Sequence, residues 1–320
     1  MKGFRYLFAF LLFAASAAWA QGYPNRPIKV TVPYAAGGLP DTMARLVGQK
    51  MGESMGQQLV VENRGGAGGI VGTTDVAKAA PDGYSLLVAD VAQIAINPHL
   101  FAKLPYDPLK ELTGVSLMGT SALYLVAHSS VPASNMQELV ALVKSQPGKL
   151  SYGSSGLGSI HHLAMEALKV GLSLDMLHVP YKGTGQSVPA LLGGQVPLLY
   201  AALPSIESHV KAGKVKILAV STPQRSAQTP EVPTVAESGV PGYDFVAEIG
   251  FYAPAGTPQD IVSKLAAEAQ KALKQPDVAQ RFKQLGIDPV GSTPEAYNAM
   301  NRASYRKYEA VVKASGAKID

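Results

Sequence analysis

Short apolar runs rich in β-branched residues alternate with stretches of helical periodicity along almost the whole chain. The run at residues 28–33 predicts a strand, and the stretch at residues 41–55 predicts the helix that follows it. Further strands are predicted at residues 58–62, 85–89, 114–118, 123–127, 150–152, 177–180, 196–201, 215–221 and 248–253. Strands separated by helices indicate an α/β fold with parallel sheets that carry helices on both faces.

The chain after residue 257 is mostly helical in pattern. Thr257-Pro258 and Thr293-Pro294 each place a hydroxyl before a proline, a pattern typical of a helix start. Gly213 and Gly316 stand where helices are expected to stop in the left-handed conformation. No flexible linker interrupts the pattern, so two domains would be joined by ordered strands, for which residues 123–127 and 248–253 are the candidates.

The first 20 residues have the organisation of a signal peptide. Lys2 and Arg5 precede an uncharged apolar run at residues 6–15, and Ala18-Trp19-Ala20 supplies the small-x-small pattern that signal peptidase recognises. The alternative, a membrane anchor, needs a span of about 20 apolar residues, which is longer than this run. We therefore expect cleavage before Gln21 and export to the periplasm.

Composition narrows the function class. Charged residues make up 16% and hydrophobic residues 47% of the chain, and the roughly 300 residues after cleavage are enough for two globular domains. The absence of cysteine excludes a lipoprotein anchor, thiolate metal sites and cysteine catalysis. The net charge of +5 falls to +3 when Lys2 and Arg5 are removed, and no basic run is interleaved with aromatic residues, so nucleic-acid binding is not expected.

The first candidate site is the turn at residues 33–41, directly after the first strand. Small residues there let a ligand approach the backbone, and the following helix offers free N–H groups that suit a carboxylate. Asp41 is expected to cap this turn or to pair with Arg45 rather than to contact a ligand. An ordinary turn is the alternative interpretation. The candidate ligand-binding residues here are Tyr34, Ala35, Ala36, Gly37 and Gly38.

The second candidate site is the glycine- and serine-rich segment at residues 152–162, which also follows a strand and opens a helix capped by Ser159. Consecutive amides and hydroxyls in such a turn form an anion-binding nest. The candidate binding residues are Ser154, Ser155, Gly158, Ser159 and His162.

More specific motifs for catalysis, dinucleotide binding or metal binding are not present in this segment. A nucleophile elbow needs G-x-S-x-G, and Gly153-Ser154-Ser155-Gly156 is one residue too short. A dinucleotide fingerprint needs glycine where His161 stands. His161 and His162 point about 100° apart on a helix and cannot hold one metal together, so one buried, hydrogen-bonded histidine is expected instead.

The third candidate site is the segment at residues 178–185, where the backbone at Gly183 and Thr184 is favoured over the side chain of Lys182. A fourth glycine cluster at residues 63–69 lacks the ending of a phosphate loop and is interpreted as a structural turn before a helix. No catalytic set, metal cluster or cofactor motif can be assembled around these turns. Backbone amides and hydroxyls are suited to reversible binding.

Motifs spread over essentially the whole chain after residue 22 resemble the Bug family, the substrate-binding proteins of tripartite tricarboxylate transporters. The segments that carry the resemblance are Tyr23-Pro24-Asn25-Arg26-Pro27-Ile28, Pro33-Tyr34-Ala35-Ala36-Gly37-Gly38 with Asp41 and Arg45, Val61-Glu62-Asn63-Arg64, Pro81-Asp82-Gly83-Tyr84, Leu104-Pro105-Tyr106-Asp107-Pro108, Ser159 with His162-Leu163, and Val179-Pro180-Tyr181-Lys182-Gly183.

The resemblance implies a periplasmic binding protein type II clamshell with two α/β domains joined by crossing hinge strands. We expect residues 23–123 plus 250–320 to form domain 1 and residues 124–249 to form domain 2. It also implies a small carboxylate ligand held by the first turn, the Gly-Ser loop and Gly183-Thr184, partly through water. The implied partners are two membrane subunits of the transporter; we expect a monomer without a cofactor.

Two positions depart from the family pattern. Tyr200-Ala201 stands where the family often has an aromatic residue followed by Asp-Asn, which disfavours an amino-acid ligand and predicts a more apolar wall. Asp90 and Gln93 lie in a loop where small hydroxyl residues are common, and we expect them to tune specificity.

The favoured ligand is a mono- or dicarboxylate, aromatic acids included. One alternative is an orphan binding protein that presents a carboxylate to a periplasmic sensor. An alternative of a different class is a periplasmic serine hydrolase that uses Ser154 or Ser155, which turnover of ester substrates would reveal.

Overall fold

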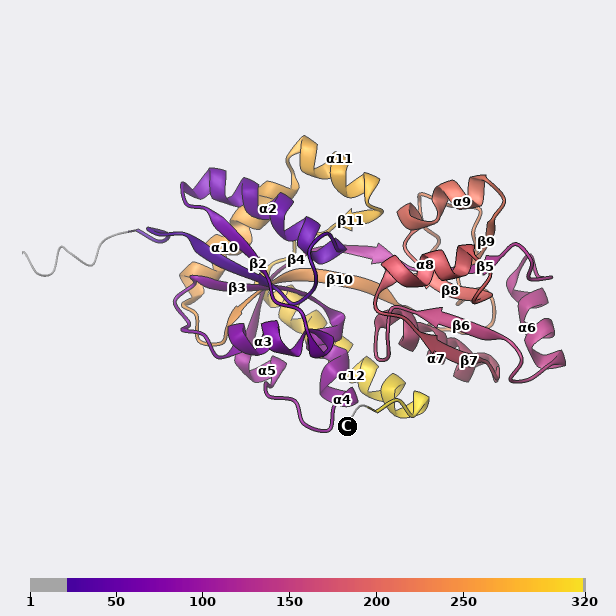
Figure 1. Cartoon of the computed structure of the whole chain (residues 1–320). Coiled ribbons are helices and arrows are strands. Elements are labelled where there is room, and N and C mark those ends of the chain that lie inside the picture. The colour runs from indigo at the N-terminus through magenta and orange to yellow at the C-terminus, as the bar shows by residue number, and fades with distance from the viewer. Residues whose placement is uncertain (1–21, 319–320) are drawn as a thin grey trace, which may run out of the picture.

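The structure, a computed structural model, describes residues 22–318 and consists of two lobes, each built on one β-sheet. The signal peptide predicted at residues 1–20 lies outside the described residues. Segments from both ends of the chain form the first lobe, and the middle of the chain forms the second (Figure 1).

The sheet of the first lobe has the strand order β11-β4-β10-β3-β1-β2. Strands β1, β2 and β3 are parallel, whereas β10 runs antiparallel to both β3 and β4. The bounds of these strands are β1 (Ile28–Val32), β2 (Leu59–Asn63), β3 (Ser85–Asp90), β4 (Leu112–Ala122), β10 (Val246–Pro254) and β11 (Ile287–Pro289).

The sheet of the second lobe has the order β7-β6-β8-β5-β9, in which β5 runs antiparallel to its neighbours β8 and β9. Its strands are β5 (Tyr124–His128), β6 (Ser151–Ser154), β7 (Leu177–Pro180), β8 (Leu198–Ala201) and β9 (Val215–Val220). All ten predicted strands are therefore confirmed, whereas the short β11 was not predicted. The prediction of purely parallel sheets is wrong, because β5 and β10, which adjoin the two connections between the lobes, run against their neighbours.

Helices cover both faces of both sheets, as the alternation of elements predicted. In the first lobe they are α2 (Leu39–Met55), η2 (Ala67–Gly69), α3 (Ile70–Ala77), the short π-helical segment η3 (Ala92–Ile96), α4 (Asn97–Leu100), α5 (Pro108–Glu111), α10 (Gln259–Leu273), α11 (Pro276–Gln284) and α12 (Pro294–Ser315). In the second lobe they are α6 (Met136–Ser145), α7 (Ile160–Leu172), α8 (Thr184–Leu192), η4 (Leu203–Ser205) and α9 (Glu207–Lys211).

Of the two caps predicted at Thr-Pro pairs, one is confirmed. Thr293 caps α12, because its side chain accepts a hydrogen bond from Ala296 N–H at 3.2 Å. Thr257 does not cap α10: the helix begins at Gln259, and the Thr257 hydroxyl donates to the Pro254 carbonyl at 2.8 Å. Gly213 and Gly316 both take the left-handed conformation, as predicted.

The lobes are connected at Leu123, between β4 and β5, and at Phe245, just before β10. Ser221 joins these two connections. Its N–H donates to the Leu123 carbonyl at 2.8 Å, its carbonyl accepts from Phe245 N–H at 3.0 Å, and its hydroxyl accepts from Leu123 N–H at 3.0 Å and donates to the Phe245 carbonyl. All polar groups of this fully buried residue are thus used to hold the two connections side by side.

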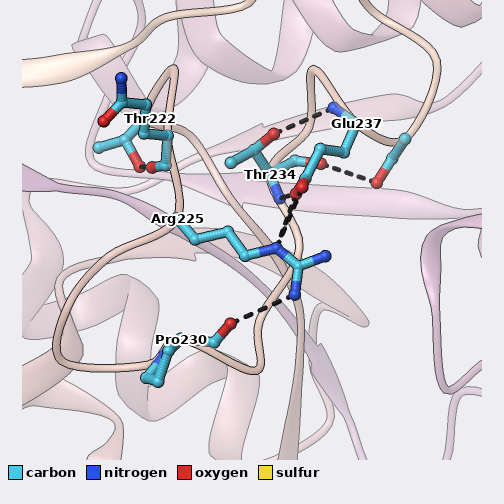
Figure 2. Close-up of polar contacts among 7 residues, drawn as sticks. Thr222, Arg225, Pro230, Thr234 and Glu237 are labelled. Atoms are coloured by element: carbon cyan, nitrogen blue, oxygen red, sulfur yellow. Dashed lines mark hydrogen bonds and ion pairs between the residues drawn. The ribbon is translucent and has the colours of Figure 1, made fainter.

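The long connection between β9 and β10 carries no helix or strand and is held by side chains (Figure 2). Arg225 Nε lies 3.1 and 3.0 Å from the two carboxylate oxygens of Glu237, and Arg225 NH1 donates to the Pro230 carbonyl at 3.2 Å. Glu237 in turn accepts from Thr234 N–H at 2.7 Å. This cluster fixes the path of the chain back to the first lobe.

The last helix does not stay within the first lobe. Its N-terminal half packs on β4 and η3, whereas Tyr308 and Val312, near its C-terminus, share a core with Leu163 and Leu168 of α7. Figure 1 shows α12 running beneath both lobes. Any division of the chain into domains has to accommodate this helix.

Candidate functional site

The first predicted binding turn lies between β1 and α2, and its residues Ala35 to Gly38 are exposed. Gly37 has a φ of +85°, which a residue with a side chain rarely adopts. Its amide is not free, because Gly37 N–H donates to Asp41 Oδ2 at 2.9 Å. The Gly37 amide, which was predicted to bind a ligand, therefore stabilises the turn instead.

Asp41 holds this turn in place. Its carboxylate accepts hydrogen bonds from Arg45 Nε at 3.0 Å and from Asn63 Nδ2 at 2.9 Å, and Asn63 also donates to the Tyr34 carbonyl. Burial acts to raise the pKa of Asp41, but the hydrogen bonds from Arg45, Gly37 and Asn63 lower it overall. Of the two predicted roles of Asp41, the pairing with Arg45 is confirmed, whereas α2 has no side-chain cap; the contribution of Asn63 was not predicted.

The side chains of Tyr34, Asp90 and Gln93 form one hydrogen-bonded cluster at the carboxyl ends of β1 and β3. The Tyr34 hydroxyl donates to Asp90 Oδ2 at 2.7 Å, and Gln93 Nε2 donates to the Tyr34 hydroxyl at 2.8 Å. The other carboxylate oxygen of Asp90 accepts from Ala92 N–H at 2.8 Å. The structure thus brings together three residues that the sequence predicted separately.

The glycine cluster at residues 65–69 packs against Gln93 of the Tyr34–Asp90–Gln93 cluster. It is a turn before α3, as predicted, and the Gly68 carbonyl accepts from both Gln93 and Asn97 at 3.1 Å. A Cβ on Gly69 would lie 2.6 Å from Gln93 Nε2, so this glycine lets Gln93 approach the backbone closely. Gln93 is fully buried and fixes the cluster rather than lining an open surface.

The Gly-Ser loop of the second lobe lies between β6 and α7. Ser159 caps α7, as predicted, by accepting a hydrogen bond from His162 N–H at 3.3 Å. His162 is buried, and its Nδ1 accepts from Gly158 N–H at 3.2 Å. As in the first turn, one glycine amide of the predicted site is therefore used within the protein.

Two serine–histidine pairs occur in this loop, but neither has the form of a catalytic set. Ser154 Oγ lies 2.6 Å from His178 Nε2, and Ser155 Oγ lies 2.8 Å from His161 Nδ1. Ser154 is only 1% exposed, and its hydroxyl also bonds the backbone of Gly156.

Burial lowers the pKa of His161 and of His178 to about 4, so both rings are neutral near pH 7. His178 stacks on His162 with 4.0 Å between ring centroids. Within residues 22–318, no carboxylate is hydrogen-bonded to either histidine of the two pairs. The expectation of one buried, hydrogen-bonded histidine is confirmed by His162, and His161 has a hydrogen-bond partner as well.

The third predicted segment adjoins the second. Tyr181 N–H donates to the Ser154 carbonyl and Gly183 N–H to the Ser155 carbonyl, both at 3.1 Å. Gly183, with a φ of +104°, precedes α8, whose first turn has no side-chain cap. Thr184 is exposed, and the first turn of α8 therefore lies beside the Gly-Ser loop with open space over Gly183.

Tyr200 and Ala201, which were predicted to form an apolar wall of the site, lie at the end of β8 in the second lobe. Both are buried in the second lobe, and the Tyr200 hydroxyl is hydrogen-bonded to the Tyr243 hydroxyl at 2.8 Å. β8 lies inside its sheet, and the assignment of these two residues to a wall of the ligand site stays a prediction.

The lobes already touch at the Gly-Ser loop. A side chain on Gly158 would overlap Leu100 of α4, which is 2% exposed, so only glycine fits this contact. Cavities of about 240 Å³ beside Leu273 and Val290 and about 50 Å³ beside Tyr252 lie away from the predicted loops. Among residues 22–318, no three histidine or acidic side chains are grouped as a metal would require. No helix in that range is long and apolar enough to span a membrane.

The sequence profile of the family described as "Tripartite tricarboxylate transporter family receptor" matches residues 43–317. The chain belongs to this family. Its members, the TctC or Bug proteins, are periplasmic solute-binding proteins and not enzymes, which confirms the resemblance, the two-domain fold and the expectation of a binding protein.

Individual receptors of the family align over nearly the whole chain. Protein BugT of Bordetella pertussis is 36% identical over 310 residues, which are 95% of this chain and 94% of BugT. The structure of MatC from Rhodopseudomonas palustris with bound malate is 35% identical with a TM-score of 0.80, and covers 91% of this chain and 100% of MatC. The structure of R. palustris Rpa4515 with adipate is 31% identical with a TM-score of 0.84, and covers 93% of this chain and 100% of Rpa4515.

Proposed function

We propose that this receptor captures a small mono- or dicarboxylate for a tripartite tricarboxylate transporter. The observation that carries the proposal is the placement of three glycine-rich loops at the carboxyl ends of β1 and β6 and before α8, where small and hydroxyl-bearing residues predominate over charged side chains. Family membership supports it, as do the malate and adipate in the related structures.

Within these loops, we assign the ligand contacts to groups that the protein does not use itself. In the first lobe these are the backbone of Ala35, Ala36 and Gly38. In the second lobe this is the start of α8 at Thr184, whereas the Ser155 hydroxyl is already bonded to His161. Charge-assisted hydrogen bonds contribute about 1.5–3 kcal/mol each, so three or four of them can leave micromolar affinity, roughly −8 kcal/mol, after ordering costs.

The remaining parts of the proposal concern organisation. Residues 23–123 plus 250–320 would form one domain and residues 124–249 the other, with α12 contacting both. The receptor would act as a monomer that delivers its ligand to two membrane subunits. Residues 1–20 would be removed on export, and the mature protein would then lack Trp19, the one tryptophan of the chain. Tryptophan fluorescence from periplasmic material would contradict this.

Calorimetric titration with malate, succinate, adipate and benzoate tests the proposed function. We expect at least one of the four acids to bind with a Kd in the micromolar range. The amides of the same acids, which have the shape but not the charge, serve as controls and should not bind. Binding of no acid, or equal binding of acids and amides, would refute the proposal.

A further inference from the structure

Asp90 places a negative charge at the site where an anionic ligand would bind. It ends β3, next to β1 in the sheet, and its carboxylate is one hydrogen bond away from Tyr34, the first residue of the first turn. The residue is partly exposed. A carboxylate in this position repels a second carboxylate at short range. The part of the ligand that lies next to Asp90 is therefore expected to be a hydrogen-bond donor rather than a carboxylate.

Within residues 22–318, no cation is paired with the Asp90 carboxylate. Among the ion pairs between described residues, Asp90 has none, whereas Asp41 at the other side of the same turn is paired with Arg45. The hydrogen bonds that Asp90 accepts come from neutral groups, the Tyr34 hydroxyl and the Ala92 amide. A carboxylate offers about four acceptor positions, so acceptor capacity remains.

A purely structural role would not need the charge. An asparagine oxygen could accept the same hydrogen bond from Ala92 N–H, and burial makes the charged form of Asp90 unfavourable, as the raised pKa of its carboxyl indicates. Gln93 fixes the geometry by bonding both Tyr34 and Gly68, so the carboxylate is held in place without a partner of opposite charge.

We propose that Asp90 determines ligand specificity by accepting a hydrogen bond from a hydroxyl or ammonium group next to the ligand carboxylate. The preferred ligands are therefore 2-hydroxy or 2-amino acids rather than unsubstituted acids. The donor has to be near the carboxylate, because Asp90 lies directly beside the turn proposed to hold that carboxylate. This inference rests on the proposed function and names its substrate class.

Succinate, malate and aspartate test it, because they share one carbon skeleton and carry hydrogen, hydroxyl or ammonium at position 2. We expect the protein to bind malate or aspartate at least about tenfold more tightly than succinate at pH 8, the effect of one charge-assisted hydrogen bond. In Asp90→Asn this preference should fall to within about threefold. The substituent that gives the larger preference identifies hydroxyl or ammonium as the donor.

Two variants separate specificity from folding. Asp288→Asn makes the same chemical change at an exposed residue of β11 and should keep the full preference. Tyr34→Phe removes the hydroxyl that bonds Asp90 but keeps the charge, so it should keep the preference even if affinity falls. Circular dichroism checks that each variant is folded.

The outcomes are distinct. Equal binding of succinate and malate by the unchanged protein, or a preference that survives in folded Asp90→Asn, would overturn the inference while leaving carboxylate binding intact. Binding of adipate or benzoate but of none of the three four-carbon acids would also overturn it. Failure of every carboxylate to bind would instead refute the proposed function.

Discussion

Glu248 is a buried acid at the point where β10 enters the first lobe, and its ionisation should weaken the fold as pH rises. The residue is 5% exposed, and both carboxylate oxygens lie within 3.2 Å of the Ser304 hydroxyl on α12. Burial, opposed by nearby Lys307 and Ser304 and reinforced by Asp244 and Asp90, raises its pKa from 4.5 to about 7.

The other titratable groups near Glu248 are the hydroxyls of Tyr252, Tyr297 and Tyr308, whose pKa values are raised and which stay protonated through this pH range. Because the folded pKa of Glu248 lies above the unfolded value, its contribution is fully present below pH 4.5 and is lost as pH rises through about 7. A shift of this size corresponds to about 3 kcal/mol in total, and to about 2–3 kcal/mol between pH 5 and pH 8.

Urea unfolding from pH 5 to pH 8, followed by circular dichroism and tyrosine fluorescence, measures this loss. In Glu248→Gln, the side chain keeps its shape and stays neutral. The free energy of unfolding should therefore fall by about 2–3 kcal/mol less between pH 5 and pH 8 than it does in the unchanged protein. Glu309→Gln, an exposed change on α12, should follow the unchanged protein. If Glu248→Gln and the unchanged protein show the same pH dependence, the assignment of a raised pKa to Glu248 is wrong.

Three further predictions concern the loops. Gly158→Val should abolish malate or adipate binding in calorimetry and lower the melting temperature, because the new side chain overlaps Leu100; unchanged affinity would contradict the contact. Ser159→Ala should lower the free energy of unfolding by about 1 kcal/mol through loss of the α7 cap, measured with urea, and no change would show that the cap is dispensable. Lys182→Ala should change the binding free energy of either acid by less than about 1 kcal/mol, because its side chain is exposed. Loss of binding in that variant would mean that the site is a charge pair rather than a backbone site.

Most strands were predictable because they are short apolar runs between polar or glycine-rich segments, although β6 and β8 contain no β-branched residue. The short β11 was not, since Ile287-Asp288-Pro289 carries no periodic pattern and is defined by its pairing with β4. The cap of α10 was misplaced because the helix begins at Gln259 with Pro258 at the cap position, so Thr257 lies outside it and its hydroxyl donates to the Pro254 carbonyl. A hydroxyl before a proline therefore indicates that a helix is near but does not by itself fix its first residue.

The candidate site was predictable at the level of loops but not of individual contacts. The glycine turns were correctly located, yet Gly37 and Gly158 donate their amides to Asp41 and His162, which are four residues away in sequence and close only in the folded turn. The burial of Tyr200 was not predictable either, because its sequence position at the end of a strand does not reveal that β8 is an inner strand. The two glycine pairings depend on the folded conformation of each turn, and the burial of Tyr200 depends on the strand order, neither of which residue spacing alone encodes.

The contacts between the lobes constrain how the receptor can open. Ser221 holds both connections together, so a rotation that keeps its hydrogen bonds is confined to the residues next to Leu123 and Phe245. On one side, Ile96, Leu100 and Tyr308 share a core with α7, and exposing each such side chain costs about 1.5–3 kcal/mol. The first turn and the start of α8 are instead exposed, with open space over Gly37 and Gly183. Movement between the lobes should therefore separate these two loops most and the α7 core least, which is the motion that admits a ligand to the proposed site.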